Sequence, residues 1–284
     1  MAGRPIPVPG EGDEMFLSHL ADLASASERG TAVSDFLTPR ECRLAAAEAA
    51  RGGWADRLFF WGGCRGSMRR AAVILPPWAE TANVPRDPLS PEREETLLRA
   101  VDEGLDGGAV REKIAAVRVI GSGYKTLTHR DYLGAVMATG VRREALGDVA
   151  VLSEHEAVVF AGRKIAVYLA AELTGVGADT VSASLFDPPR DFTVPRRFEP
   201  VSGTVQSPRL DGVIHALCNV SRADAASLVS RGDVSLNDFP AAAGDAPVEP
   251  GDVISVRGHG KYLIDGVSDV TRKGRLRLTA RKFI

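Results

Sequence analysis

This 284-residue sequence has few cysteines and no long apolar stretch. Its basic and acidic side chains nearly balance, so the formal net charge is only −2. Its cysteines, Cys42, Cys64 and Cys218, form no CxxC pair and have no histidine pair nearby, which argues against a metal site or a disulfide framework. No apolar run approaches the roughly 18 residues of a membrane span, and the N-terminus has no signal-peptide pattern. We therefore expect a cytoplasmic protein with no membrane partner.

Two motifs of nucleotide chemistry are present only in fragments. The glycine-rich stretch 62–70 (GGCRGSMRR) is not followed by Gly-Lys-Ser/Thr, so it lacks the lysine and the magnesium-binding hydroxyl of a phosphate-binding loop. The triplet at 129–131 is His-Arg-Asp, as in a kinase catalytic loop, but Val136 replaces the required asparagine and no Asp-Phe-Gly follows. These gaps favour a protein that is not an enzyme, with no catalytic residue, no cofactor and no small-molecule substrate.

The same triplet has a structural explanation. Thr128 is a good helix N-cap, and Asp131, three residues later, can return a hydrogen bond to the first amide. His129 and Arg130 would then lie at the exposed start of a helix, where we predict contact with RNA.

Composition and periodicity indicate a multidomain α+β chain. Helical patterns and a strand-turn-strand pattern predict an N-terminal α+β domain over 1–84. The acidic, proline-containing segment 85–112 is typical of a linker or a solvated connecting helix. A middle domain is expected over 113–190 and a C-terminal domain over 207–284.

The middle domain shows alternating patterns in the order β-α-β-β-α-β. This is the ferredoxin-like arrangement, which RRM-type RNA-binding domains share. The aromatic octapeptide of an RRM is missing from the third strand, where Phe160 is the only aromatic residue, so base stacking on this sheet is doubtful. We expect phosphate contacts from loop residues instead, above all Arg142 and Arg143.

The C-terminal part begins with two short amphipathic helices, and Ser221 and Gly232 mark the start and end of the second. Its pattern is RLD, SR-x-x-A-x-x-L, G-x-V-x-x-N and GD-x-IS-V-RG, which resembles the S4-like RNA-binding domain. In that family, the two helices present arginines to structured RNA. The resemblance therefore implies RNA contacts from Arg209, Ser221, Arg222 and Arg231.

The last fifteen residues carry six basic side chains and no acidic one. Such a segment either solvates a strand or lies along phosphate. We predict that Arg257 extends the RNA contact of the helices, and that Lys261 with this basic tail reaches a neighbouring RNA strand or a tRNA.

The stretch from Thr126 to Asp148 (TL-x-HRD-x-LGA-x-M-x-x-G-x-RRE-x-x-GD), FLTPREC at Phe36, FFWGG at Phe59 and the final TRKGRLRL resemble the YlmH-type S4-domain proteins. The resemblance covers nearly the whole chain. It implies a bacterial cytosolic protein that binds rRNA of the large ribosomal subunit, together with the peptidyl-tRNA left on stalled or split ribosomes, in ribosome-associated quality control.

Two other functions compete with this one. S4-like domains are often fused to RNA-modifying enzymes, yet the sequence shows neither a glycine-rich strand-to-helix turn for a methyl donor nor a synthase-type catalytic aspartate motif. A protein-interaction scaffold that docks through the N-terminal helices is the third possibility.

Overall fold

The computed structural model describes residues 12–79, 84–102, 107–270 and 274–284. The chain divides into two compact units, Met1–Pro195 and Arg196–Ile284, which are described separately. In the described ranges, no helix combines the length and the apolar character needed to span a membrane.

The N-terminal part of the first unit is built on a three-stranded antiparallel sheet in the order β1-β3-β2. Thr38 and Glu41 form a complete capping box, with Pro39 at the first helical position, so α2 begins where the sequence predicts. Strand β1 was not predicted, because a bulge between Val33 and Phe36 breaks the two-residue alternation on which strand prediction depends. The elements are α1 (Glu14–Ala26), β1 (Ala32–Leu37), α2 (Pro39–Gly52), β2 (Leu58–Trp61) and β3 (Arg70–Ile74).

The segment expected to be an acidic linker forms α3 (Pro91–Asp102) and α4 (Gly107–Lys113). The side chain of Arg93 on α3 is 2% exposed. Its guanidinium group donates hydrogen bonds to the carbonyl oxygens of Asp56 (2.7 Å) and Leu58 (3.0 Å), and burial lowers its pKa. The expectation of a solvated connecting helix is therefore wrong for α3: this helix anchors the end of the N-terminal sheet.

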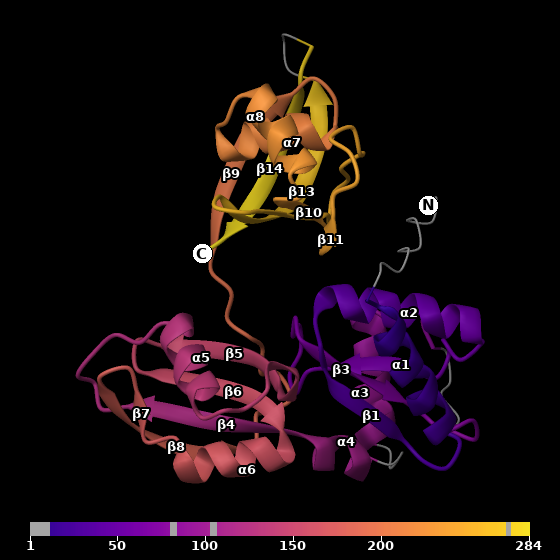
Figure 1. The fold of residues 1–284 in the computed structure, drawn as a ribbon, viewed down its shortest axis with the longest axis vertical. Coiled ribbons are helices and arrows are strands. Elements are labelled where there is room, and N and C mark those ends of the chain that lie inside the picture. The colour runs from indigo at the N-terminus through magenta and orange to yellow at the C-terminus, as the bar shows by residue number, and fades with distance from the viewer. Residues whose placement is uncertain (1–11, 80–83, 103–106, 271–273) are drawn as a thin grey trace. The chain divides into compact units, whose positions relative to one another are not determined.

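The middle part of the first unit follows the predicted element order, with a short extra strand before the last one. Its five strands are all antiparallel, in the order β5-β6-β4-β8-β7, and α5 and α6 pack with them around one apolar core (Figure 1). The elements are β4 (Ile114–Gly121), α5 (His129–Ala138), the 3-10 turn Arg143–Ala145, β5 (Leu146–Ser153), β6 (Glu156–Gly162), α6 (Arg163–Glu172), β7 (Gly175–Val176) and β8 (Asp179–Phe186).

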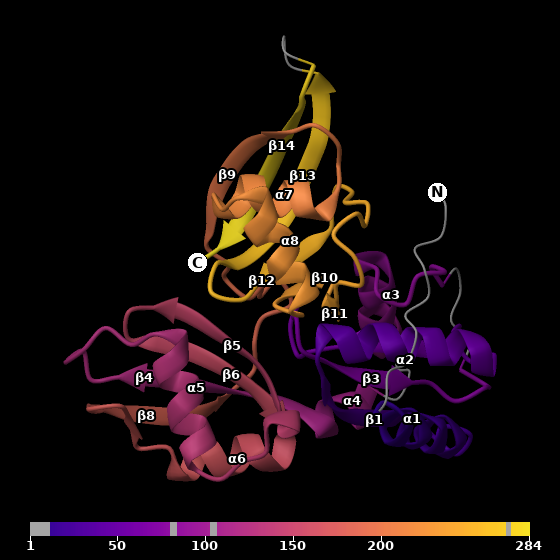
Figure 2. The same ribbon diagram turned by 45° about the horizontal axis from the view of Figure 1, so that its top comes forward.

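The C-terminal unit is a six-stranded antiparallel sheet in the order β11-β10-β12-β13-β14-β9, and α7 and α8 cover one of its faces (Figure 1, Figure 2). Strand β9 precedes the predicted start at 207 and pairs with β14 along its full length. The elements are β9 (Phe198–Val205), α7 (Leu210–Cys218), α8 (Arg222–Ser230), β10 (Val234–Leu236), β11 (Phe239–Pro240), β12 (Val253–Val256), β13 (Gly260–Val270) and β14 (Leu276–Phe283).

Candidate nucleic-acid interface

The face of the middle sheet that points away from α5 and α6 is closed by the chain itself. Phe160 on β6 is fully buried, and the ring of Phe192 lies over it with 6.0 Å between centroids in an edge-on arrangement. Phe192 contacts Phe186 at the same distance, and Cys64 and Val194 complete the apolar cluster. Because these side chains occupy the position of a stacked base, this face is unsuited to RRM-like base stacking.

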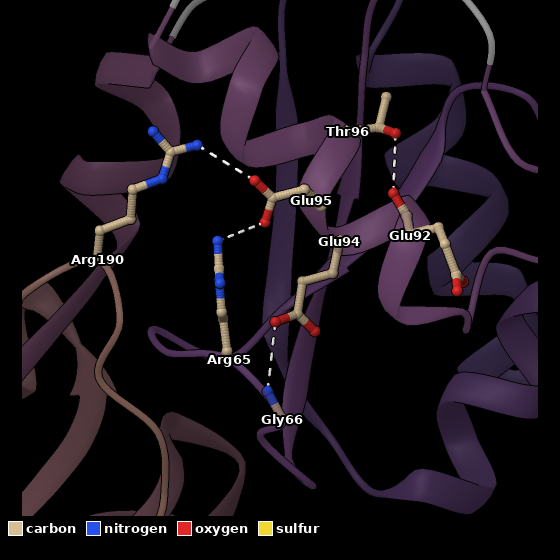
Figure 3. A network of polar contacts seen from close by, with 7 residues as sticks. All are labelled: Arg65, Gly66, Glu92, Glu94, Glu95, Thr96 and Arg190. Carbon is tan, nitrogen blue, oxygen red and sulfur yellow. Dashed lines mark hydrogen bonds and ion pairs between the residues drawn. The ribbon is translucent and has the colours of Figure 1, made fainter.

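An ion pair links the covering segment to α3, within a wider group of polar contacts (Figure 3). Glu95 on α3 binds Arg65 (Nη2 to Oε2, 2.5 Å) and Arg190 (Nη2 to Oε1, 3.3 Å). Beside it, the buried Glu94 accepts a hydrogen bond from the backbone N–H of Gly66 (3.3 Å), and burial raises its pKa. The segment after β8 is thereby tied to the N-terminal helices and covers the sheet as an integral layer.

The start of α5 presents two of the predicted RNA contacts. Thr128 and Asp131 form the expected capping box, in which the Thr128 N–H donates to Asp131 Oδ2 at 2.8 Å. This bond and the one from the Thr128 hydroxyl lower the pKa of Asp131. His129 and Arg130 are both exposed, as predicted for the first turn.

The loop before α5 adds two exposed side chains that sequence reasoning missed, Tyr124 and Lys125. The side chain of Tyr124 is 76% exposed. The loop is fixed at its base, because the N–H of Leu127 donates to the carbonyl of Glu154 (2.7 Å) and the ring Nδ1 of His155 lies 2.9 Å from the Lys125 carbonyl oxygen. The sequence signal that could have identified them is a tyrosine followed by a lysine in a loop rich in glycine and serine, between an expected strand and an expected helix.

Arg142 and Arg143 are adjacent in sequence but differ in environment. The Arg142 side chain is 76% exposed, and its guanidinium lies 3.5 Å from a carboxylate oxygen of Asp35. Arg143 donates to the Leu146 carbonyl at 2.9 Å, and burial lowers its pKa. Arg143 therefore supports the turn before β5, while Arg142 remains accessible to phosphate.

In the C-terminal unit, Arg209 and Arg222 lie at the beginnings of α7 and α8. Arg209 is the N-cap residue of α7, is about half exposed and lies 3.4 Å from Asp211 (Nε to Oδ1). Arg222, the exposed first residue of α8, places Nη2 3.5 Å from the point where a Cβ on Gly212 would lie. The absence of a side chain at Gly212 lets the guanidinium of one helix lie over the first turn of the other.

Ser221 acts as the helix cap that its position predicts. Its hydroxyl oxygen accepts from the N–H of Asp224 at 3.1 Å and lies 2.7 Å from that residue's carboxylate. These bonds engage the hydroxyl, so its part at the interface is to fix the conformation in which Arg222 starts α8.

Arg231 and Arg257 converge on one acid, although 26 positions separate them in sequence. Arg231 Nε lies 3.0 Å from Asp233 Oδ2, and Arg257 Nη1 lies 3.7 Å from Asp233 Oδ1. Their side chains are 60% and 87% exposed. The pair forms a second basic cluster, at the end of α8.

Lys261 lies on the opposite side of the sheet from these helices. Residues paired across antiparallel strands share a face, and Lys261 pairs with Ser255, whereas the neighbouring Ile254 and Val256 point into the core beneath α7 and α8. Lys261 Nζ binds Asp238 Oδ1 at 3.1 Å. The predicted contact of Lys261 with a neighbouring RNA strand or a tRNA would therefore be made from the side of the sheet opposite α7 and α8. Arg272 and Lys273 of the basic tail lie outside the described residues.

Comparison with known proteins agrees with these features. Residues 116–187 match the family model described as "Putative RNA-binding domain in YlmH". The chain is 29% identical over 249 residues to "Ribosome-associated protein quality control protein P2" of Bacillus subtilis (strain 168), which covers 87% of this chain and 85% of that protein. The chain is thus similar to the YlmH-type proteins, in its middle part by the family model and over most of its length by this relative.

The matched segment spans almost all of β4 to β8, and so includes the start of α5 and Arg142. The solved structure "Cell division protein ylmH from Streptococcus pneumoniae" shares 15% identity, with a TM-score of 0.44, over 63% of this chain and 94% of the other. That likeness is too weak to add to the assignment.

Proposed function

We propose that this protein is a non-catalytic RNA-binding factor of ribosome-associated quality control in the cytoplasm. Its partners would be rRNA of the large ribosomal subunit and peptidyl-tRNA on stalled or split ribosomes. The matched RNA-binding domain and the relative's printed name support the class of function. The observation that carries the proposal is the position of the Arg222 guanidinium beside the first turn of α7, the helix for which Arg209 is the N-cap residue.

Two fold assignments belong to this proposal. The middle strand order β5-β6-β4-β8 with antiparallel neighbours is compatible with a ferredoxin-like domain. Two short helices followed by the strands that carry the GD-x-IS-V motif are compatible with an S4-like domain over the C-terminal unit. Both are domain types that bind RNA by shape and backbone contact, which suits exposed arginines better than base readout.

The mechanism we infer is electrostatic docking. Guanidinium groups of Arg209 and Arg222 bind phosphate oxygens of an rRNA helix as bidentate forks, while Arg231 and Arg257 extend the contact. The RNA phosphates replace Asp211 and Asp233 as partners of these arginines, so the ion pairs seen in the structure hold the side chains ready. His129, Arg130 and Arg142 supply a separate contact from the middle domain.

Sedimentation with ribosomal particles tests the proposal. The wild type should pellet preferentially with large subunits that carry peptidyl-tRNA, compared with bare large subunits or small subunits, at moderate and at high salt. Arg209→Ala with Arg222→Ala should weaken this binding by roughly 100-fold, because two charge-assisted contacts are lost. It should also flatten the logarithmic salt dependence by about two units.

Arg51→Ala is the matched control, since Arg51 is an exposed arginine on α2 that pairs with Glu48 three residues away. It should leave affinity and salt slope unchanged. Equal binding by the double variant and the wild type, with the same slope, would contradict the assignment of the RNA contact to α7 and α8.

A further inference from the structure

The sheet of the C-terminal unit has two unlike faces. On β14, Leu278 and Ala280 point into the core beneath α7 and α8, so the alternate residues Arg277, Thr279 and Arg281 point to the other side. We call that other side of β13, β14 and β9 the outer face. Figure 1 and Figure 2 show both helices of the unit on the opposite face of the sheet.

Two phenylalanines and an arginine form a layered group on the outer face. Phe198 on β9 and Phe283 on β14 are directly paired, with ring centroids 4.8 Å apart and planes tilted by 58°. The guanidinium carbon of Arg281 lies 4.8 Å from the centroid of Phe198. The guanidinium group of Arg281 therefore lies over the ring of Phe198.

Asp265 fixes the edge of the same guanidinium. Arg281 donates from Nε and from Nη2 to Asp265 Oδ1, each at 2.9 Å. The Asp265 carboxylate and the Phe198 ring beneath it hold the guanidinium group in place, while 43% of the Arg281 side chain remains exposed. The result is a flat, oriented platform, which has the geometry on which a nucleobase stacks.

Two cationic side chains share the outer face with the platform. Lys261 Nζ lies 5.9 Å from the centroid of Phe283, and Arg277 is exposed on the same face. An apolar partner would have to remove these charges from water, at a cost that the two rings cannot offset. An unpaired nucleotide offers a flat π surface to the platform and a phosphate to the cations, and so matches both features.

We propose that the outer face binds an unpaired RNA nucleotide, whose base stacks on Arg281 above Phe198 and whose phosphate reaches Lys261 or Arg277. This site is distinct from the arginines of α7 and α8, and it rests on the proposed function only for the identity of the partner as RNA. It also gives Lys261 a role that its position on the outer face allows.

The test uses the full chain and two fluorescent RNAs, a hairpin and the same hairpin with a five-nucleotide single-stranded 3′ extension, in anisotropy titrations. For the wild type, the extension should tighten binding by about tenfold. Phe198→Leu and Arg281→Lys should each remove most of that gain and leave hairpin affinity unchanged. Arg281→Lys keeps the positive charge but removes the planar guanidinium group, so it separates base stacking from electrostatic attraction to phosphate. Ser202→Ala, an exposed change on the outer face opposite Thr279, is the control and should retain the full gain.

Arg209→Ala with Arg222→Ala separates this inference from the proposed function. That variant should weaken binding to both RNAs and keep the ratio between them. A wild type that gains nothing from the extension, or a gain that survives both platform variants, overturns the inference. If the extension adds nothing while the platform variants weaken sedimentation with large subunits, the outer face contacts a protein, and the inference is again wrong.

Discussion

The two larger sheets of this protein share one design and differ in what lies on the side away from their helices. The middle sheet is closed there by Phe192 and neighbouring residues of its own chain, with Phe160 fully buried beneath them. The C-terminal sheet leaves its outer face open, with the Arg281 side chain 43% exposed. A sheet within an RNA-binding domain is therefore not by itself a surface for bases, and access depends on what the following segment covers.

The largest effect on stability is expected when one phenylalanine on each sheet is replaced by alanine. Phe160→Ala should lower the free energy of unfolding by about 3–5 kcal/mol, because it leaves a cavity in a closed layer. Phe283→Ala should cost only about 1 kcal/mol, since its ring is already partly hydrated. Urea unfolding followed by tryptophan fluorescence reports the first unit, where all three tryptophans lie, and far-UV circular dichroism follows both units. Equal losses in the two variants would contradict the distinction between a closed and an open face.

The second test compares arginines. Arg69 donates to the carbonyl oxygens of Leu146 (2.9 Å), Phe36 (3.0 Å) and Arg143 (3.2 Å), so it joins the N-terminal and middle parts. Arg69→Ala should cost about 2–3 kcal/mol, because three partly buried acceptors lose their donor. Arg281→Ala removes an exposed ion pair and should cost less than about 1 kcal/mol.

The same urea titrations measure both arginine variants. The contrast fails if Arg69→Ala unfolds at the wild-type midpoint. It also fails if Arg281→Ala shifts the midpoint as far as Arg69→Ala does, since Arg281 would then be a structural arginine like Arg69.

Local patterns predicted the elements of the middle domain well, and long-range contacts explain the failures. Apolar alternation and the Thr128 cap are properties of neighbouring residues, so β4, α5 and β6 could be predicted from the sequence. Strand β9 is half exposed and polar, and its partner β14 lies more than 70 positions away, so no local pattern marks it. Acidic residues suggested a solvated helix at α3, because nothing nearby in sequence shows that Arg93 reaches backbone carbonyls of the segment before β2.

In the candidate site, too, the sequence predicted local features but not those that depend on the fold. The resemblance to the S4-like domain implied RNA contacts from Arg209, Arg222 and Arg231, which Arg257 was predicted to extend. The structure places these four side chains at the surface. The sequence could not separate Arg142 from Arg143, whose environments depend on the fold of the turn before β5. Nor could it place Lys261 on the outer face, because the register of β12 and β13 decides that.

The third test compares glycines in the helices that cover the two sheets. A Cβ on Gly134 in α5 would meet nothing within 4 Å, so Gly134→Ala should stabilise the first unit by about 0.5–1 kcal/mol through helix propensity alone. A Cβ on Gly212 in α7 would contact Arg222 Nη2 at 3.5 Å, an ordinary distance, so Gly212→Ala should fold normally. It should weaken hairpin binding about two- to threefold, because the methyl group restricts the guanidinium. Thermal melting measures the stability of both variants, and anisotropy measures their affinity for the hairpin. If Gly134→Ala loses as much RNA affinity as Gly212→Ala, the position of Gly212 beside Arg222 does not explain the loss.

The smallest effect is the acid sensitivity of the α5 cap, which carries His129 and Arg130. Hydrogen bonds from Thr128 lower the folded-state pKa of Asp131 below its ordinary value of 3.8, so its contribution to stability is complete above that value and is lost as the pH falls through the lower folded pKa. The cap should therefore be constant from pH 8 to pH 5 and weaken only in strong acid. The Thr128 amide shift in an NMR titration from pH 6 to pH 2 measures this, and a midpoint at or above 3.8 would contradict the capping geometry. Thr128→Ala removes the hydroxyl group that lowers the pKa of Asp131 most, so it should move the titration midpoint of Asp131 toward 3.8. This shift would show that the Thr128 hydroxyl is bonded to Asp131 at the first turn of α5.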